Sequence, residues 1–80
     1  MQYFVYILKS IKDGKRYIGM SSNLDRRISE HNDGKVKSTK FRKPFELIYT
    51  EEFNNKSDAL KREKFLKTHA GRNFLDSINK

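Results

Sequence analysis

The segment that most constrains this chain is 3–8, Tyr-Phe-Val-Tyr-Ile-Leu, in which odd and even positions alike carry apolar or aromatic side chains. Successive side chains of a strand point to opposite faces, so apolar residues at both parities require cover on both faces. β-branched and aromatic residues also favour strands over helices. We therefore expect residues 3–8 to form the central strand of a sheet that lies between two layers.

A hairpin is predicted directly after this strand. Asp-Gly at 13–14 stands between two strand-like runs and is typical of a two-residue turn. The returning strand would be 16–21, in a register that places Tyr6 opposite Ser21. In that register Tyr6 and Tyr17 project from the same face of the hairpin.

Start and stop signals place the remaining elements. The sequence predicts a helix that Ser22 caps and Gly34 closes, a loop over 35–43, a third strand over 45–53, a helix from Asn55 to about His69 that Gly71 ends, and a short helix over 72–78. The fold class is therefore α/β: a small three-stranded, mostly antiparallel sheet flanked by helices, in the order β-β-α-β-α-α. A length of 80 residues predicts a single domain over 1–80.

The net charge restricts the kind of molecule that this chain is expected to bind. The formal net charge is +8, and a quarter of the residues are Leu, Ile, Val or Phe, which is enough for a thin core. The absence of cysteine excludes disulfides, thiolate zinc sites and cysteine nucleophiles. The longest apolar run, 3–8, is far shorter than the ~20 residues of a membrane span. We expect a cytoplasmic protein that binds a polyanion, with nucleic acid favoured over a membrane surface.

The first predicted helix carries polar side chains on its apolar stripe. Leu24 and Ile28 begin the stripe, and the positions that would complete it hold Arg27 and His31. Either these two side chains point toward the sheet, or the stripe is narrow and both reach solvent at its edge.

The next helix has the same irregularity. Glu63 lies among the residues of its predicted buried stripe, which are Ala59, Leu60, Leu66 and Ala70. A carboxylate in such a place needs a cation or a metal. The structural alternatives are an ion pair between Glu63 and Arg27, or a surface pair with one of the neighbouring cations Arg62, Lys64 and Lys67.

Each tyrosine alone would be ordinary amphipathic packing in a strand. Taken together, however, the polar residues could form one pocket for cleaving a phosphodiester; they are Tyr6, Tyr17, Arg27, His31 and Glu63. Glu63 could hold one Mg²⁺, which proteins often bind through one or two carboxylates, water and substrate phosphate. Arg27 could clamp the scissile phosphate with its planar guanidinium.

Two tyrosine motifs identify a family resemblance. Val5-Tyr6-Ile7 stands where the first family signature falls, and Tyr17-Ile18-Gly19 matches the second; Arg27, His31 and Glu63 follow at the expected offsets. The chain resembles the GIY-YIG endonuclease superfamily, and in particular its small stand-alone bacterial members related to the nuclease domain of the bacterial repair excinuclease.

The resemblance implies a mechanism. One divalent ion, Mg²⁺ or Mn²⁺, would lie on Glu63, and water would attack in line. Tyr6 or Tyr17 would be the general base or would position the nucleophile, and which of the two does so stays open. Arg27 would stabilise the transition state, and His31 would orient a tyrosine hydroxyl or assist proton transfer.

The sequence departs from the family pattern at three places. Val5 stands where the first signature has glycine. Met20 stands where nuclease members often have lysine, and Lys15 or Lys67 could replace that contact. Asn73 is the nearest candidate for the asparagine that many members carry on the terminal helix.

The loop over 35–43 is the segment predicted to bind nucleic acid. It contains five cations and no acid, and its phosphate-binding candidates are Lys35, Lys37, Lys40, Arg42 and Lys43. A solvated basic connector is the alternative. We expect a metal-dependent DNA endonuclease directed by structure or backbone, with RNA not excluded, in DNA repair or recombination. The alternatives are a catalytically weak binding module of the same fold within a larger repair assembly, and a buried polar network in an interaction domain.

Overall fold

The computed structural model describes residues 1–79, and its elements follow the predicted order. They are β1 (Tyr3–Ser10), β2 (Arg16–Ser21), α1 (Leu24–Asn32), β3 (Phe45–Phe53), α2 (Lys56–Leu66) and α3 (His69–Ser77). The strands form one sheet in the order β2-β1-β3, and both pairings are antiparallel. The α/β fold class and the central place of the first strand are confirmed.

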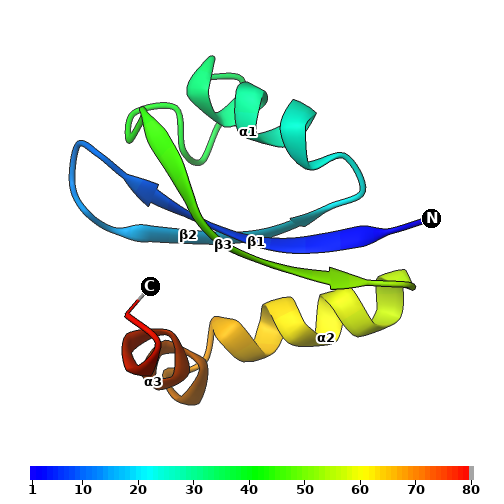
Figure 1. Ribbon diagram of the computed structural model, residues 1–80. Coiled ribbons are helices and arrows are strands. Elements are labelled where there is room, and N and C mark those ends of the chain that lie inside the picture. The colour runs from blue at the N-terminus through cyan, green and yellow to red at the C-terminus, as the bar shows by residue number, and fades with distance from the viewer. Residues whose placement is uncertain (80) are drawn as a thin grey trace.

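The sheet separates two apolar layers (Figure 1). On one face α2 and α3 cover Val5 and Ile7, which pack with Ala59, Leu66 and Leu75. On the other face, beneath α1, lie Tyr6 and Leu8 with Phe45, Tyr17, Leu24 and Ile28. β1 is therefore covered on both faces, as its two-sided apolar pattern predicted.

The hairpin register differs from the prediction by two residues. Tyr6 pairs with Gly19 rather than with Ser21, and the last pair before the turn is Lys9 with Arg16. The Ser10 hydroxyl accepts hydrogen bonds from two backbone amides of the turn, which widens it beyond two residues. A shift of two residues preserves side-chain parity, so both tyrosines still project from one face.

The helix boundaries also correct the prediction. Asn23, not Ser22, caps α1, because its side chain accepts from the Arg26 amide; Asn55 caps α2 in the same way, as predicted. α2 ends at Leu66, and α3 begins after the Thr68 cap. Gly71 therefore lies inside α3 and breaks no helix.

Gly71 marks a close approach of two helices. A methyl group at this position would collide with the Phe65 carbonyl oxygen and with Leu66 Cα at the end of α2. The neighbouring Ala70 is exposed rather than part of the buried stripe of α2. Glycine is required here because neighbouring backbone atoms leave no room for a Cβ, and not because the backbone needs a positive φ.

The segment 35–43, hereafter the basic loop, is fastened to the β1–β2 turn. The Ser10 hydroxyl donates to the Arg42 carbonyl, and Lys12 Nζ donates to the Phe41 carbonyl at 3.1 Å. The Arg42 guanidinium pairs with Asp13 at 3.2 Å. The basic loop is therefore part of the packed structure rather than a free connector.

Within the same 79 residues, no helix is both long enough and apolar enough to cross a bilayer.

Candidate active site

Tyr6 and Gly19 form the centre of the candidate site. The Tyr6 side chain is 1% exposed, and its ring crosses over Gly19, its pairing partner on β2. A Cβ at Gly19 would lie 2.5 Å from the phenol oxygen and 2.6 Å from the ring carbon that bears it. The glycine therefore lets the hydroxyl of a buried central strand reach β2, an edge strand of the sheet.

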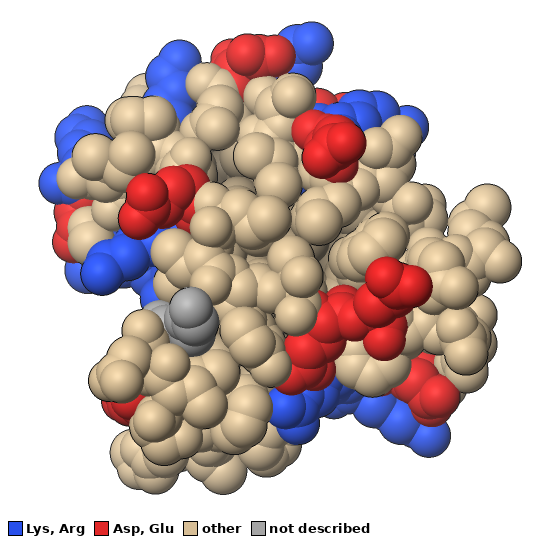
Figure 2. All heavy atoms as spheres, viewed as in Figure 1, with Lys and Arg blue, Asp and Glu red and all other residues tan. Residues whose placement is uncertain are grey.

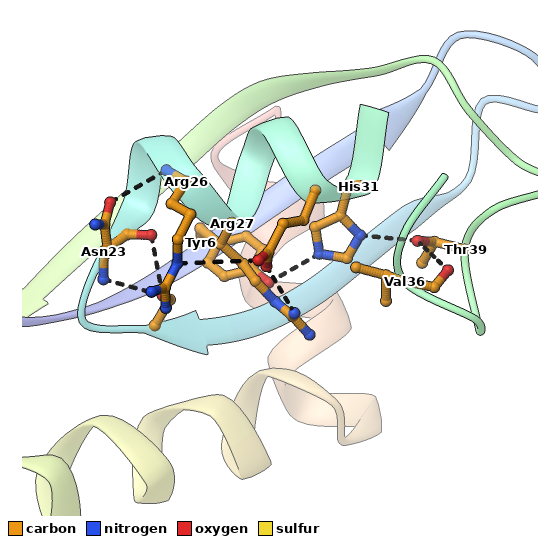
Figure 3. Close-up of polar contacts among 9 residues, drawn as sticks. Tyr6, Asn23, Arg26, Arg27, His31, Val36 and Thr39 are labelled. Carbon is orange, nitrogen blue, oxygen red and sulfur yellow. Dashed lines mark hydrogen bonds and ion pairs between the residues drawn. The ribbon is translucent and has the colours of Figure 1, made fainter. Parts of the chain in front are cut away.

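His31 points from α1 toward this phenol. It is fully buried, and its Nε2 lies 3.0 Å from the Tyr6 oxygen, while its Nδ1 lies 2.8 Å from Thr39 Oγ1 (Figure 3). Burial, with a smaller contribution from the Arg27 charge, lowers the pKa of His31 to about 4. At neutral pH the imidazole is therefore uncharged and carries one N–H.

The hydrogen-bond partners of Thr39 assign the position of that proton. The Thr39 hydroxyl has a second partner, the Val36 carbonyl at 3.4 Å, to which it can only donate. If Thr39 donates to Val36, it accepts from His31 Nδ1–H, and Nε2 is left to accept from the Tyr6 hydroxyl. This arrangement satisfies every buried proton in the chain Tyr6–His31–Thr39.

The Tyr6 phenol remains protonated near neutral pH. Burial raises its pKa, the charges of Tyr17 and Glu63 raise it further, and the Arg27 guanidinium opposes the rise. Of the two charged residues, Arg27 comes from α1 and Glu63 from α2. These two helices lie on opposite faces of the sheet (Figure 1).

Tyr17 is the more accessible phenol. Its ring centroid lies 4.8 Å from that of His31 and 6.3 Å from that of Tyr6. It is half-buried and lines a solvent-open cleft of about 730 Å³ between β2 and the α2–α3 pair. Four cations line this cleft, namely Lys15, Arg16, Lys67 and Arg72, with Ile18, Leu66 and Leu75 as its apolar wall.

Glu63 and Arg27 form ion pairs with other residues rather than with each other. Lys67 pairs with Glu63 at 2.9 Å, and Arg27 pairs with Glu30 at 3.1 Å. The Glu63 side chain remains 17% exposed and the Arg27 side chain 35% exposed, so both are accessible to a ligand. Of the structural alternatives, the observed pair is the one on the surface of α2, with Lys67.

The donor chemistry fits one hard cation. Residues 1–79 contain no cluster of three or more His, Cys, Asp or Glu side chains able to hold a metal. Mg²⁺ and Mn²⁺ do not need such a cage, because one carboxylate, water and substrate phosphate can complete their coordination. Glu63, whose side chain is partly exposed, suits this mode.

The other predicted residues are placed as follows. Lys15 and Lys67 line the cleft, whereas Asn73 is exposed on α3 and its neighbour Arg72 lines the cleft instead. Met20 packs on the apolar core beneath α2 and α3. In the basic loop the four lysines are exposed, whereas Arg42 is half-buried and engaged with Asp13.

Two residues of the site are not predicted by the sequence. Thr39 stands there only as a spacer among cations, and no periodicity marks a loop residue as buried. Gly19 belongs to a recognisable motif, but its contact with Tyr6 depends on a register that the turn residues do not reveal.

Comparison with known proteins agrees with this geometry. Residues 2–76 match the model of the GIY-YIG catalytic domain. The chain belongs to the GIY-YIG family. A UPF0213 protein of Staphylococcus saprophyticus is 42% identical over 79 residues, covering 98% of this chain and 95% of the relative. One from Staphylococcus epidermidis is 44% identical over 78 residues, covering 96% and 94%.

A solved structure of the same group is also similar. The solution NMR structure of a UPF0213 protein from Bacillus halodurans has 38% sequence identity and a TM-score of 0.60, covering 99% of this chain and 86% of that one. This GIY-YIG chain therefore matches small proteins along nearly their whole length.

The buried histidine predicts a pH dependence of stability. The pKa of His31 is about 4 in the folded protein against an ordinary 6.5, so the unfolded chain takes up this proton first as the pH falls. The stabilisation is complete above about pH 6.5 and is lost progressively down to about pH 4, by up to about 3 kcal/mol. Urea unfolding between pH 4 and 7.5 measures it.

His31→Gln should make the free energy of unfolding nearly independent of pH over this range. His69→Gln is the matched control, because His69 is exposed on α3, and it should leave the wild-type slope intact. Equal slopes in wild type and His31→Gln would contradict a neutral His31.

Proposed function

We propose that this protein is a metal-dependent DNA endonuclease that hydrolyses phosphodiester bonds, directed by structure or backbone rather than by sequence, in repair or recombination. One observation carries the proposal: the ring of Tyr17, which lines the cationic cleft, lies 4.8 Å from His31 and 6.3 Å from Tyr6 between ring centroids, so the two tyrosines and the histidine form one cluster. Family membership supports nuclease chemistry, and the cationic cleft beside Tyr17 supports a polyanionic substrate.

Each residue has a task in this proposal. Glu63 would hold one Mg²⁺ or Mn²⁺, which when bound offsets phosphate charge and activates water. Arg27 clamps the scissile phosphate and stabilises the charge that develops in the transition state. Tyr17, which lines the cleft, orients the attacking water in line with the leaving oxygen.

Tyr6 acts as a positioning residue. It is almost completely buried, and its proton is directed to His31, so it is a poor candidate for taking a proton from water. The chain Tyr6–His31–Thr39 instead fixes the phenol oxygen that Arg27 faces. Of the two tyrosines, we propose Tyr17 for direct contact with the nucleophile.

A second candidate function is nucleic-acid binding with little cleavage. Two observations favour it. Met20 packs against the apolar core rather than lining the cleft, and Lys67 already forms an ion pair with Glu63. The four exposed lysines of the basic loop serve either function.

The decisive experiment compares two site variants with two matched controls. Purified protein is incubated with nicked, flapped, branched and linear DNA in Mg²⁺ or Mn²⁺. Glu63→Gln and Arg27→Ala are each expected to slow cleavage at least about 100-fold while DNA binding persists, since single groups that stabilise transition-state charge contribute ~10²–10³ in rate. EDTA should stop the wild-type reaction.

Glu52→Gln and Arg26→Ala are the controls. Glu52 lies exposed on β3, and Arg26 is 65% exposed next to Arg27 on α1. Both variants should cleave within about threefold of wild type. Equal residual cleavage in all five proteins would indicate contamination and refute the endonuclease, whereas tight binding without cleavage would establish the second candidate.

A further inference from the structure

The basic loop presents a large aromatic ring to solvent. Phe41 is 76% exposed, which is unusual for a residue that could bury its ring in a small core. The Lys40 ammonium lies 4.9 Å from the ring centroid, a cation–π contact on the surface. Phe41 contributes to neither apolar core layer, so its exposure calls for another explanation.

The backbone holds this ring in place from both sides. Thr39 is buried and bonded to His31, and Arg42 is bonded to Asp13 and lies over the Phe45 ring. Between them, the Phe41 carbonyl accepts from Lys12. Phe41 is therefore an exposed side chain on an ordered support.

The surroundings of the ring are cationic. Lys12, which donates to the Phe41 carbonyl, and the four lysines of the basic loop are all exposed. Figure 2 shows lysine and arginine side chains along the left-hand side of the molecule, where the β1–β2 turn and the basic loop lie, with acidic side chains among them, and its largest acidic group over the far end of β3. An aromatic face among cations suits a polyanion that carries planar rings, which is a nucleic acid with accessible bases.

The β1–β2 turn links the basic loop to the cleft. Gly14 and Lys15 of the β1–β2 turn line the cleft, and the same turn is bonded to Phe41 and Arg42 through Lys12 and Asp13. A nucleic-acid strand that leaves the cleft past Lys15 would follow this turn toward the basic loop, where Phe41 is the exposed aromatic residue. Bases in intact duplex are stacked on each other, whereas an unpaired base has a free face.

We propose that Phe41 is a stacking platform for an unpaired base, and that the preferred substrates of this site are DNA structures with single-stranded nucleotides beside a duplex. The statement about substrates rests on the proposed endonuclease function, but the stacking itself does not. A polyanionic protein partner would be held by the same lysines, yet it would not favour single-stranded over duplex DNA.

The test measures binding, in the Glu63→Gln background, so that cleavage does not interfere. The probes are a flapped oligonucleotide with 2-aminopurine in the unpaired arm and a fully paired duplex. Phe41→Ala should weaken flap binding about 5- to 100-fold, the range expected for loss of one stacked base, and should change duplex binding less than about twofold. The quenching of 2-aminopurine on binding should disappear.

Two further variants complete the design. Phe41→Trp should restore both affinity and quenching, whereas Leu47→Ala, which removes a 41% exposed apolar side chain from β3, should change neither. An equal loss on flap and duplex, or no loss on either, would overturn the stacking role. Stacking in a wild-type protein that cleaves nothing would refute the endonuclease alone, and cleavage without flap preference would refute this inference alone.

Discussion

Replacing Gly71 by alanine should lower the free energy of unfolding by about 3 kcal/mol or more. The added methyl group would meet the Phe65 carbonyl and Leu66 Cα, which are backbone atoms at the end of a helix and cannot rotate away. Overpacking against atoms that cannot yield is among the largest single-residue effects on stability. For a domain of this size the melting temperature should fall by more than about 10 °C.

Asn73→Ala is the matched control for Gly71→Ala. Asn73 lies on the same helix and is exposed, so its truncation should change the free energy of unfolding by less than about 0.5 kcal/mol. Thermal and urea unfolding of both variants measure the difference. A Gly71→Ala protein as stable as wild type would mean that α2 and α3 do not touch at this point.

Replacing Gly19 by alanine should damage the site more than the fold. The new methyl group would displace the Tyr6 phenol and break its 3.0 Å contact with His31. We expect a loss of about 1–3 kcal/mol in stability and, if the proposed function holds, at least about 100-fold slower cleavage.

A double-mutant cycle identifies the cause of this effect. With Tyr6→Leu already present, no phenol lies over position 19, so adding Gly19→Ala should cost much less stability than in wild type. The coupling should exceed about 1 kcal/mol, which is typical of residues in direct contact. Additive effects would show that the two side chains do not compete for one space.

The order of elements could be predicted because it depends on local signals. The two-sided apolar pattern of β1 and the Asn55 cap of α2 are both visible directly in the chain. The predicted hairpin register is wrong because the register is decided by the hydrogen bonds of the Ser10 hydroxyl within the turn. The prediction of Gly71 as a helix breaker is wrong because a glycine needed for close contact and one needed for a bend look alike in sequence.

Some of the residues that the sequence predicts for the site lie together in the structure, but the contacts between them could not be predicted. Arg27 and His31 stand out because they interrupt an apolar stripe; His31 is buried against Tyr6, whereas Arg27 remains 35% exposed. The partner of His31, Thr39, could not be predicted because the fold of a loop is set by contacts distant in sequence. The same holds for Arg42, whose engagement with Asp13 depends on the register of the β1–β2 hairpin.

The position of Tyr17 and Gly19 on an edge strand has a consequence for access. The cleft at β2 opens sideways to solvent rather than lying enclosed within the fold. A polymer can therefore be laid against it anywhere along its length, with no terminus to be threaded through a tunnel. A covalently closed circle would reach the cleft as readily as a linear molecule, which is the topology that internal cleavage demands.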